Sequence, residues 1–216
     1  MSAASAVIAI LGAVFLGVIS PGPSFIVVAR NAIGLSRRAG LATALGMGTG
    51  GVIFSGLALL GLFTLLAQVQ WLYIGLKIAG GLYLVYIGYR MWRGAAEPLS
   101  FDDLQNVAVP TAHTHSLRAY WVGLTTQLSN PKAAIVYASI FAALLPQHPP
   151  ARCYAVLPPA LFAIEAGWYA AVAVLFSSGG ARQLYGKAKA LIDRVAATAI
   201  TALGLRLILT AHRTGI

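Results

Sequence analysis

Glu165 is the side chain whose position most clearly suggests chemistry. It is one of only five acidic residues in a chain of 216, and uncharged, mostly apolar residues surround it for several helical turns on both sides. An ionised carboxylate in such surroundings is costly unless a cation or strong donors accompany it. A carboxyl group of this kind can carry a proton or bind an amino group. The alternative is a structural ion pair, for which Lys132 is the cation expected at a similar depth.

Two proline motifs interrupt apolar segments and form a second candidate for chemistry. One is Pro21-Gly22-Pro23, and the other is Asn130-Pro131-Lys132. A proline inside a helix removes one backbone hydrogen bond and clashes with the preceding turn. A half-helix that begins after such a break presents free N–H groups and partial positive charge, where a carboxylate could dock. A proline kink without a ligand is the alternative.

Long apolar segments must position these residues. Hydrophobic residues make up 59% of the chain and charged residues only 9%, which is too little charge to cover a water-facing surface. Segments of about 20 apolar residues cross the hydrocarbon core of a membrane. The sequence predicts about six such helices, at about residues 8–34, 41–66, 71–92, 119–145, 154–176 and 191–211.

The two halves of the chain resemble each other. Residues 20–29 align with residues 129–138, and both segments contain proline at the break. Each half holds three predicted spans, so the halves would lie inverted in the membrane, as in many transporters. We therefore predict an all-α integral membrane fold of about six transmembrane helices, built as two inverted three-helix repeats with broken first and fourth helices. The repeats are residues 1–93 and 118–216 of a single membrane domain, joined by a polar cytoplasmic loop at residues 94–117.

Basic residues predict the orientation of the chain. Lys and Arg number 15 against five acidic residues, and most follow the first, third and fifth predicted spans. These residues are Arg37, Arg38, Arg90, Arg93, Arg118, Arg182, Lys187, Lys189 and Arg194. The opposite side carries Arg152, Arg206 and Arg213. The positive-inside rule places the larger set and the loop around Leu104 in the cytoplasm, and both termini on the periplasmic side.

The same patterns argue against several classes of function. The basic residues lie between apolar segments instead of forming the polar, aromatic-rich surface of a nucleic-acid-binding domain. The single cysteine, Cys153, allows neither an intrachain disulfide nor a CxxC motif. His113 and His115 fall in the polar loop, where we expect solvated side chains. We therefore predict no metal, no cofactor and no enzymatic activity.

Eight short elements of the sequence carry a family resemblance. They are SPGP at 20–23, ARNA at 29–32, RRAG at 37–40, LGMG at 45–48, GGLYL at 80–84, YIG at 86–88, NPKA at 130–133 and LPQ at 145–147. Together they resemble the lysine exporter superfamily, in its homoserine/threonine resistance branch, from about Val14 to Arg213. The resemblance implies a multi-pass exporter in the bacterial inner membrane that moves amino acids or related small metabolites, driven by the proton gradient.

The candidate substrate and coupling residues follow from the two breaks, from the buried acid and from one polar position beyond the first break. They are Pro21, Gly22, Pro23, Ser24, Asn31, Asn130, Pro131, Lys132 and Glu165. Secondary candidates are Lys77, Gly46 and Gly50. Lys77 is expected to extend its ammonium group to the membrane surface, and the glycines to serve close helix packing, since no strand precedes them as in a dinucleotide site.

The expected partners are a small-molecule substrate, protons and the lipid bilayer. Export of metal ions and a passive channel of the same architecture are the alternative functions. The sequence leaves open the substrate, the coupling stoichiometry and the oligomeric state, with a homodimer as one alternative.

Overall fold

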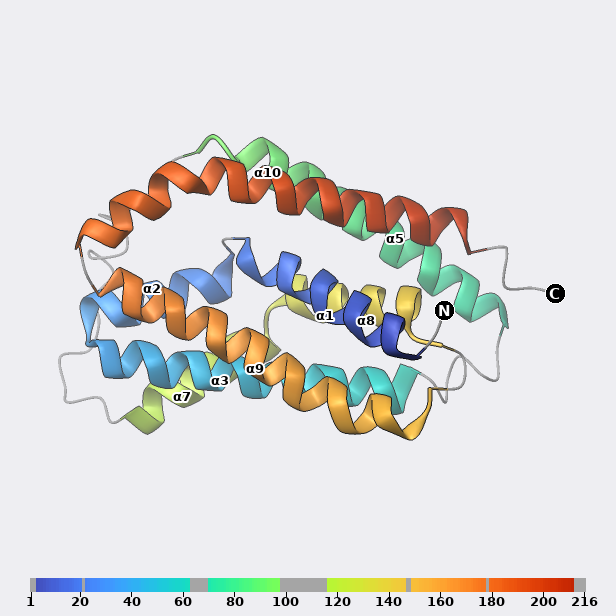
Figure 1. Ribbon diagram of the computed structural model, residues 1–216, viewed down its shortest axis with the longest axis horizontal. Coiled ribbons are helices and arrows are strands. Elements are labelled where there is room, and N and C mark those ends of the chain that lie inside the picture. The colour runs from blue at the N-terminus through green and yellow to red at the C-terminus, as the bar shows by residue number, and fades with distance from the viewer. Residues whose placement is uncertain are drawn as a thin grey trace.

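The computed structural model describes residues 3–20, 22–62, 70–97, 116–146, 149–177 and 179–211, and its regular elements in these ranges are helices (Figure 1). The α-helices are α1 (Ala3–Ile19), α2 (Pro23–Gly34), α3 (Arg37–Leu57), α5 (Gln70–Gly94), α7 (Ser116–Leu128), α8 (Pro131–Leu144), α9 (Ala151–Phe176) and α10 (Gly179–Leu209). A short π-helical segment, η1 (Ala58–Leu62), extends α3. The predicted all-helical class is thus confirmed for the described residues.

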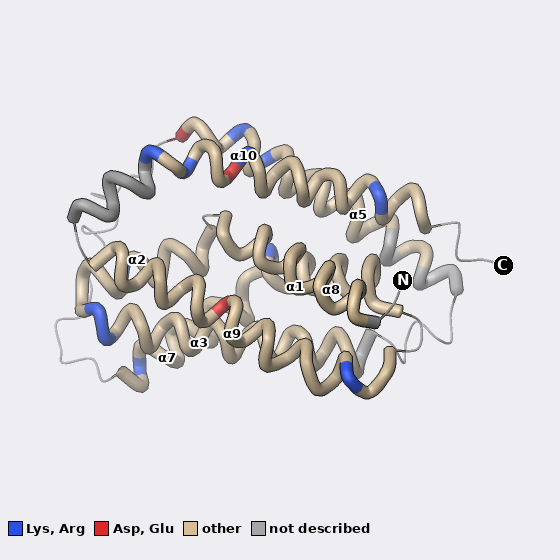
Figure 2. Tube along the Cα trace, in the orientation of Figure 1, with Lys and Arg blue, Asp and Glu red and all other residues tan. Residues whose placement is uncertain are grey.

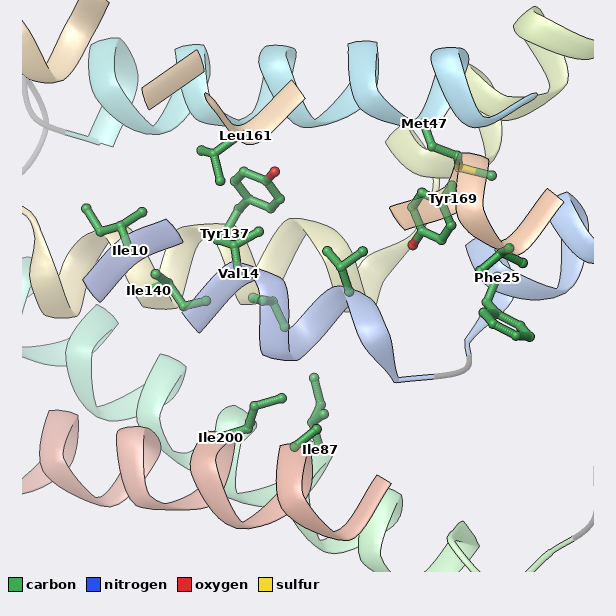
Figure 3. Close-up of a cluster of buried hydrophobic side chains, with 14 of the residues drawn as sticks. Ile10, Val14, Phe25, Met47, Ile87, Tyr137, Ile140, Leu161, Tyr169 and Ile200 are labelled. Carbon is green, nitrogen blue, oxygen red and sulfur yellow. The ribbon is translucent and has the colours of Figure 1, made fainter. Parts of the chain in front are cut away.

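The helices are arranged in layers. In Figure 1, α5 and α10 lie together along one side of the molecule, α1 and α8 occupy its middle, and α3, α7 and α9 form the opposite side. The apolar core between the middle helices and the α5–α10 pair contains Ile10 of α1, Ile87 of α5, Ile140 of α8 and Ile200 of α10 (Figure 3). Broken helices therefore lie inside the bundle, where neighbouring helices can satisfy their freed polar groups.

Glycines permit the closest helix contacts. A Cβ on Gly46 of α3 would collide with the backbone carbonyl oxygen of Tyr120 in α7, and a Cβ on Gly123 of α7 would collide with that of Thr43. The α3 and α7 backbones therefore touch directly, as small residues allow in membrane helices. Gly46 acts here in packing, which agrees with the interpretation of the glycine string as a packing element.

We expect Gly46→Ala to destabilise the protein by about 1–3 kcal/mol, because the new methyl group meets backbone atoms that cannot rotate away. The unfolding temperature in detergent, monitored by size-exclusion chromatography of heated samples, measures the loss of stability. Gly56→Ala is the matched control on the same helix, since nothing lies within 4 Å of a Cβ there. An unchanged unfolding temperature for Gly46→Ala would show that α3 and α7 are not in backbone contact.

The described helices meet the requirements of a membrane span to different degrees. Residues Arg37–Leu60 and Ala151–Phe176 are each long and apolar enough to cross a bilayer, and α1 with α2, bent by 58°, make a third span if counted together. Pro158 and Pro159 lie within α9 without ending it. Of the six predicted spans, the described helices thus supply two by length and composition, or three with the bent pair.

One predicted loop is wrong. The residues after the fifth span, including Lys187 and Lys189, were expected to form a connection ahead of a helix starting at about Leu191. Instead α10 begins at Gly179 and runs for 31 residues. The segment carries too many charges for a span, but charge density does not oppose helix formation, so the helix extends beyond its apolar part.

Some predictions concern residues outside the described ranges. These are Pro21, the part of the polar loop that contains Leu104, His113 and His115, and the C-terminal residues Arg213 and Gly215.

Candidate functional site

Both predicted helix breaks are present. α2 begins at Pro23 after Gly22, whose backbone is extended and which supplies no side-chain cap. α8 begins at Pro131 after Asn130, whose Oδ1 accepts a hydrogen bond of 3.0 Å from the backbone N–H of Lys132. Proline suits the first position of a helix because its missing N–H would have no partner there. Each proline therefore starts a new half-helix.

The two breaks meet at one small cavity of about 30 Å³. Its polar lining residues are Ser20, Ser24, Gln127, Asn130, Lys132, Tyr137, Glu165 and Tyr169. This volume accommodates one or two water molecules. Ligand pockets usually measure about 300–1,000 Å³. The cavity is therefore too small for an amino acid as it stands, and a substrate would need the helices around it to separate.

A chain of hydrogen bonds connects the breaks to α9. Asn130 Nδ2 donates to Ser24 Oγ at 3.0 Å, and Ser24 Oγ donates to Gln127 Oε1 at 2.7 Å. Gln127 Nε2 then donates to Glu165 Oε2 at 2.8 Å, while Tyr137 OH donates to Oε1 of the same carboxyl group at 2.9 Å. Buried networks of this kind hold their members in one geometry when every group is satisfied. A change in the protonation or position of Glu165 can therefore affect both helix breaks through Gln127, Ser24 and Asn130.

Glu165 is enclosed by these donors. Its side chain is 0% exposed, and it occupies the acidic position in the middle of α9 (Figure 2). Gly51 of α3 leaves room for it, because a Cβ there would lie 2.8 Å from both Glu165 Oε2 and Tyr137 OH. Figure 3 shows the Tyr137 side chain directed from α8 toward α3. The carboxyl group thus has two neutral donors and a fixed position at mid-depth of the bundle.

The structural pair of Glu165 with Lys132, which the sequence left open, is not formed in this conformation. Within the described part of the chain, the ion pair that forms joins Lys189 to Asp193, and Lys132 has no carboxylate at ion-pair distance. Lys132 Nζ instead lies beside the first break, 3.6 Å from the point where a Cβ on Gly22 would be. The rotation of α8 explains this, since it turns Tyr137 and not Lys132 toward α9.

The remaining candidates lie around the cavity or away from it. Asn31 is outside the cavity lining and donates from Nδ2 to Thr43 Oγ1 at 2.8 Å, which ties α2 to α3. Gly50 packs on Gln127, whose Cγ would lie 2.6 Å from a Cβ at this glycine. Lys77 belongs to α5, and its side chain is outside the described set.

The sequence interpretation missed four polar residues of the site. Ser20 directly precedes Pro21, Gln127 lies three residues before Asn130, Tyr137 lies six residues after Pro131, and Tyr169 is one turn beyond Glu165. All four are buried. Their nearness in sequence to a break or to the buried acid is a signal that could have identified them.

The regular elements of the described residues are all helices, with apolar spans and two helix breaks that meet at a cavity with polar lining, which places the chain among multi-pass membrane proteins. Residues 14–211 match the family described as LysE type translocator, and the chain belongs to this family. The resemblance predicted from the short sequence elements is thereby confirmed. The family consists of translocators, so the prediction that the chain is not an enzyme is confirmed as well.

Several relatives carry names that describe their activity. The chain is 32% identical over 200 residues to the threonine efflux protein of Salmonella typhi, with 90% of this chain and 93% of the relative covered. It is 30% identical over 195 residues to the threonine efflux protein of Escherichia coli K12, with the same coverage. It is also 30% identical over 189 residues to the uncharacterized membrane protein YahN of that strain, covering 88% of this chain and 82% of the relative. No solved structure matches the chain.

Proposed function

We propose that this chain is a secondary transporter that exports amino acids or related small metabolites across the bacterial inner membrane in exchange for protons. The observation that carries the proposal is the convergence of two half-helix starts and the buried carboxyl of Glu165 on one cavity. The names of the threonine efflux relatives support a substrate of this chemical class. L-Threonine is therefore the first substrate to test.

The site offers complementary groups for the two ends of an amino acid. The start of α2 has no side-chain cap, and its partial positive charge lies beside the ammonium group of Lys132. This is the place we assign to the substrate carboxylate. Glu165, linked to the same break by hydrogen bonds, is the place we assign to the substrate amino group.

Competition at Glu165 gives a mechanism for coupling. The carboxyl group can hold a proton, or it can ionise and bind the ammonium group of the substrate, but one site does not accommodate both. Each substrate that leaves toward the periplasm is then replaced by a proton, which the carboxyl releases on the cytoplasmic side. The Gln127 and Tyr137 donors keep the carboxyl in place in either state. Exchange thus requires the closed cavity to open to one side at a time.

We extend the proposal to six spans in two inverted repeats. The element contacts support it: α3 packs on α9, α5 packs on α10, α1 contacts α8 and α2 contacts α7. The first two pairs join the second span to the fifth and the third span to the sixth. The other two pairs join the first and fourth spans, with the first half of each span packed on the second half of the other. Elements that lie near the axis of an inverted repeat pack on their counterparts, as these pairs do.

The proposed topology predicts that both termini lie in the periplasm. Fusion of a reporter at Gly215 should give activity only with the periplasmic enzyme alkaline phosphatase, whereas fusion at Leu104 should give activity only with a cytoplasmic fluorescent protein. Both fusion points lie outside the described residues. Cytoplasmic fluorescence from the Gly215 fusion would reject six spans in this orientation.

The activity itself can be tested in two stages. Cells that express the chain are grown on a panel of amino acids and toxic analogues, and resistance identifies exported compounds. Purified protein in liposomes is then assayed for counterflow of radiolabelled L-threonine with and without a pH gradient. Saturable counterflow supports a carrier. A current that follows the reversal potential of an ion would instead indicate a channel, and resistance only to metal salts would indicate a metal exporter.

A further inference from the structure

The cavity at the two helix breaks has an apolar wall as well as a polar one. Two helices that contact each other, α1 and α8, form the apolar wall, which consists of Val14, Gly17, Val18, Ala133 and Val136. The three positions on α1 follow the i, i+3, i+4 spacing and the two on α8 are three apart, so each set lies on one face of its helix. None of the five has a hydrogen-bonding side chain, and we call this surface the α1–α8 wall.

Gly17 and Val136 leave little room between the two helices. Both residues are buried, and Val136 is 5% exposed. A Cβ on Gly17 would lie 3.3 Å from Val136 Cγ1, so the backbone of α1 faces this methyl group without a side chain between them. Valine in a helix strongly prefers one χ1 rotamer, which fixes the position of the methyl group. These two residues therefore set the width of the cavity at the α1–α8 wall.

The inference rests on the proposed function, which assigns the substrate carboxylate to the break beside Lys132 and the amino group to Glu165. With these two ends fixed, the side chain of an L-amino acid leaves its Cα in one direction. The polar groups between the two places already hydrogen-bond to one another. The α1–α8 wall is thus the part of the lining that remains for the substrate side chain, and ligand sites commonly combine an apolar lining with a few orienting polar groups.

We propose that the α1–α8 wall is the subsite for the substrate side chain, and that Val136 and Gly17 restrict the substrates to amino acids with short, uncharged side chains. A longer side chain collides with the Val136 methyl groups when the helices separate only as far as a small substrate requires. A charged side chain finds no partner on this wall, and burial of a charge without a partner is costly. L-Threonine belongs to the accepted class, whereas L-leucine and L-lysine lie outside it.

The test measures selectivity, defined as the maximal rate divided by the KM for one amino acid relative to another, by counterflow in proteoliposomes that contain the full chain. Val136→Ala removes both methyl groups, so the selectivity for L-leucine over L-threonine should rise about tenfold or more, the effect of a methylene in an apolar pocket. L-Lysine should gain nothing, because the wall stays uncharged. Gly17→Ala narrows the wall from the other helix and should lower the selectivity for L-threonine over L-alanine by about tenfold.

Two further variants serve as controls. Val172→Ala makes the same chemical change at a buried valine that does not line the cavity, and it should keep the parent selectivity. The double variant Gly17→Ala/Val136→Ala adds one methyl group where two have been removed, so its selectivity should return toward the parent, as expected for residues in contact. Because selectivity is a ratio within one preparation, partial loss of folded protein in a variant cancels.

The outcomes separate this inference from the proposed function. If the parent carries L-threonine but Val136→Ala and Gly17→Ala keep the parent selectivity, the α1–α8 wall does not contact the substrate side chain and this inference alone is overturned. An equal change of selectivity in Val172→Ala also overturns it, because looser packing anywhere in the bundle then explains the effect. If the parent shows no saturable counterflow of any amino acid, the proposed function fails and the subsite fails with it.

Discussion

Glu165→Gln is expected to abolish export driven by a pH gradient while retaining counterflow of threonine down its own gradient. The replacement is nearly isosteric and can keep both hydrogen bonds. The new amide oxygen can accept from Gln127 Nε2, and the new amide nitrogen can donate to Tyr137 OH, whose hydroxyl hydrogen rotates freely. The variant should therefore fold, but it has no group that takes up or releases a proton.

The measurement is uphill flux of threonine in proteoliposomes with and without an imposed pH gradient. The parent protein should respond to the gradient, and the Gln variant should give the same flux in both conditions. Glu165→Asp retains the titrating group but is shorter by one methylene and cannot reach both donors, so we expect partial coupling. A Gln variant that follows the gradient as the parent does would show that Glu165 is not the coupling residue.

Tyr137→Phe is a useful companion variant. It removes one donor from the carboxyl group and leaves the titrating group in place. Coupling should persist with an altered pH dependence, which distinguishes loss of the proton carrier from disturbance of its surroundings.

Pro131→Leu is expected to abolish export while leaving most of the protein folded. Proline has no N–H to bond the carbonyl oxygen four residues earlier, which belongs to Gln127. Leucine supplies that N–H and favours a helix that continues from α7 into α8. Such a helix would turn Asn130 away from Ser24 and Gln127 away from Glu165, so the hydrogen-bond chain around the cavity would be lost.

The control for this variant lies in α9. Pro159 is inside a continuous helix, is exposed and does not line the cavity, so Pro159→Leu makes the same chemical change without closing a break. The transport activity of both variants is measured as threonine counterflow in liposomes that contain equal amounts of monodisperse protein. Parent-level counterflow for Pro131→Leu would mean that the second break is a kink without a role in binding.

The sequence alone determined the features that depend on local composition. Apolar segments of sufficient length predicted helices, and α3 with η1, α5, α7 with α8, and α9 lie within a few residues of the predicted spans. The two breaks were predicted because proline and its missing N–H act on the backbone of their own segment. Glu165 was recognised because a charge inside an apolar segment is unusual at any helix rotation.

Only the tertiary structure decided which side chains meet. The sequence left open whether Lys132, expected at a similar depth, pairs with Glu165, because depth leaves the rotation of each helix about its axis undetermined. The fold turns Gln127 and Tyr137 toward Glu165, and it places Lys132 beside the first break at Gly22. Asn31, predicted as a site residue, contacts Thr43 outside the cavity lining for the same reason. Partners are set by helix rotation and packing, which depend on contacts between segments far apart in the chain, and no local pattern contains that information.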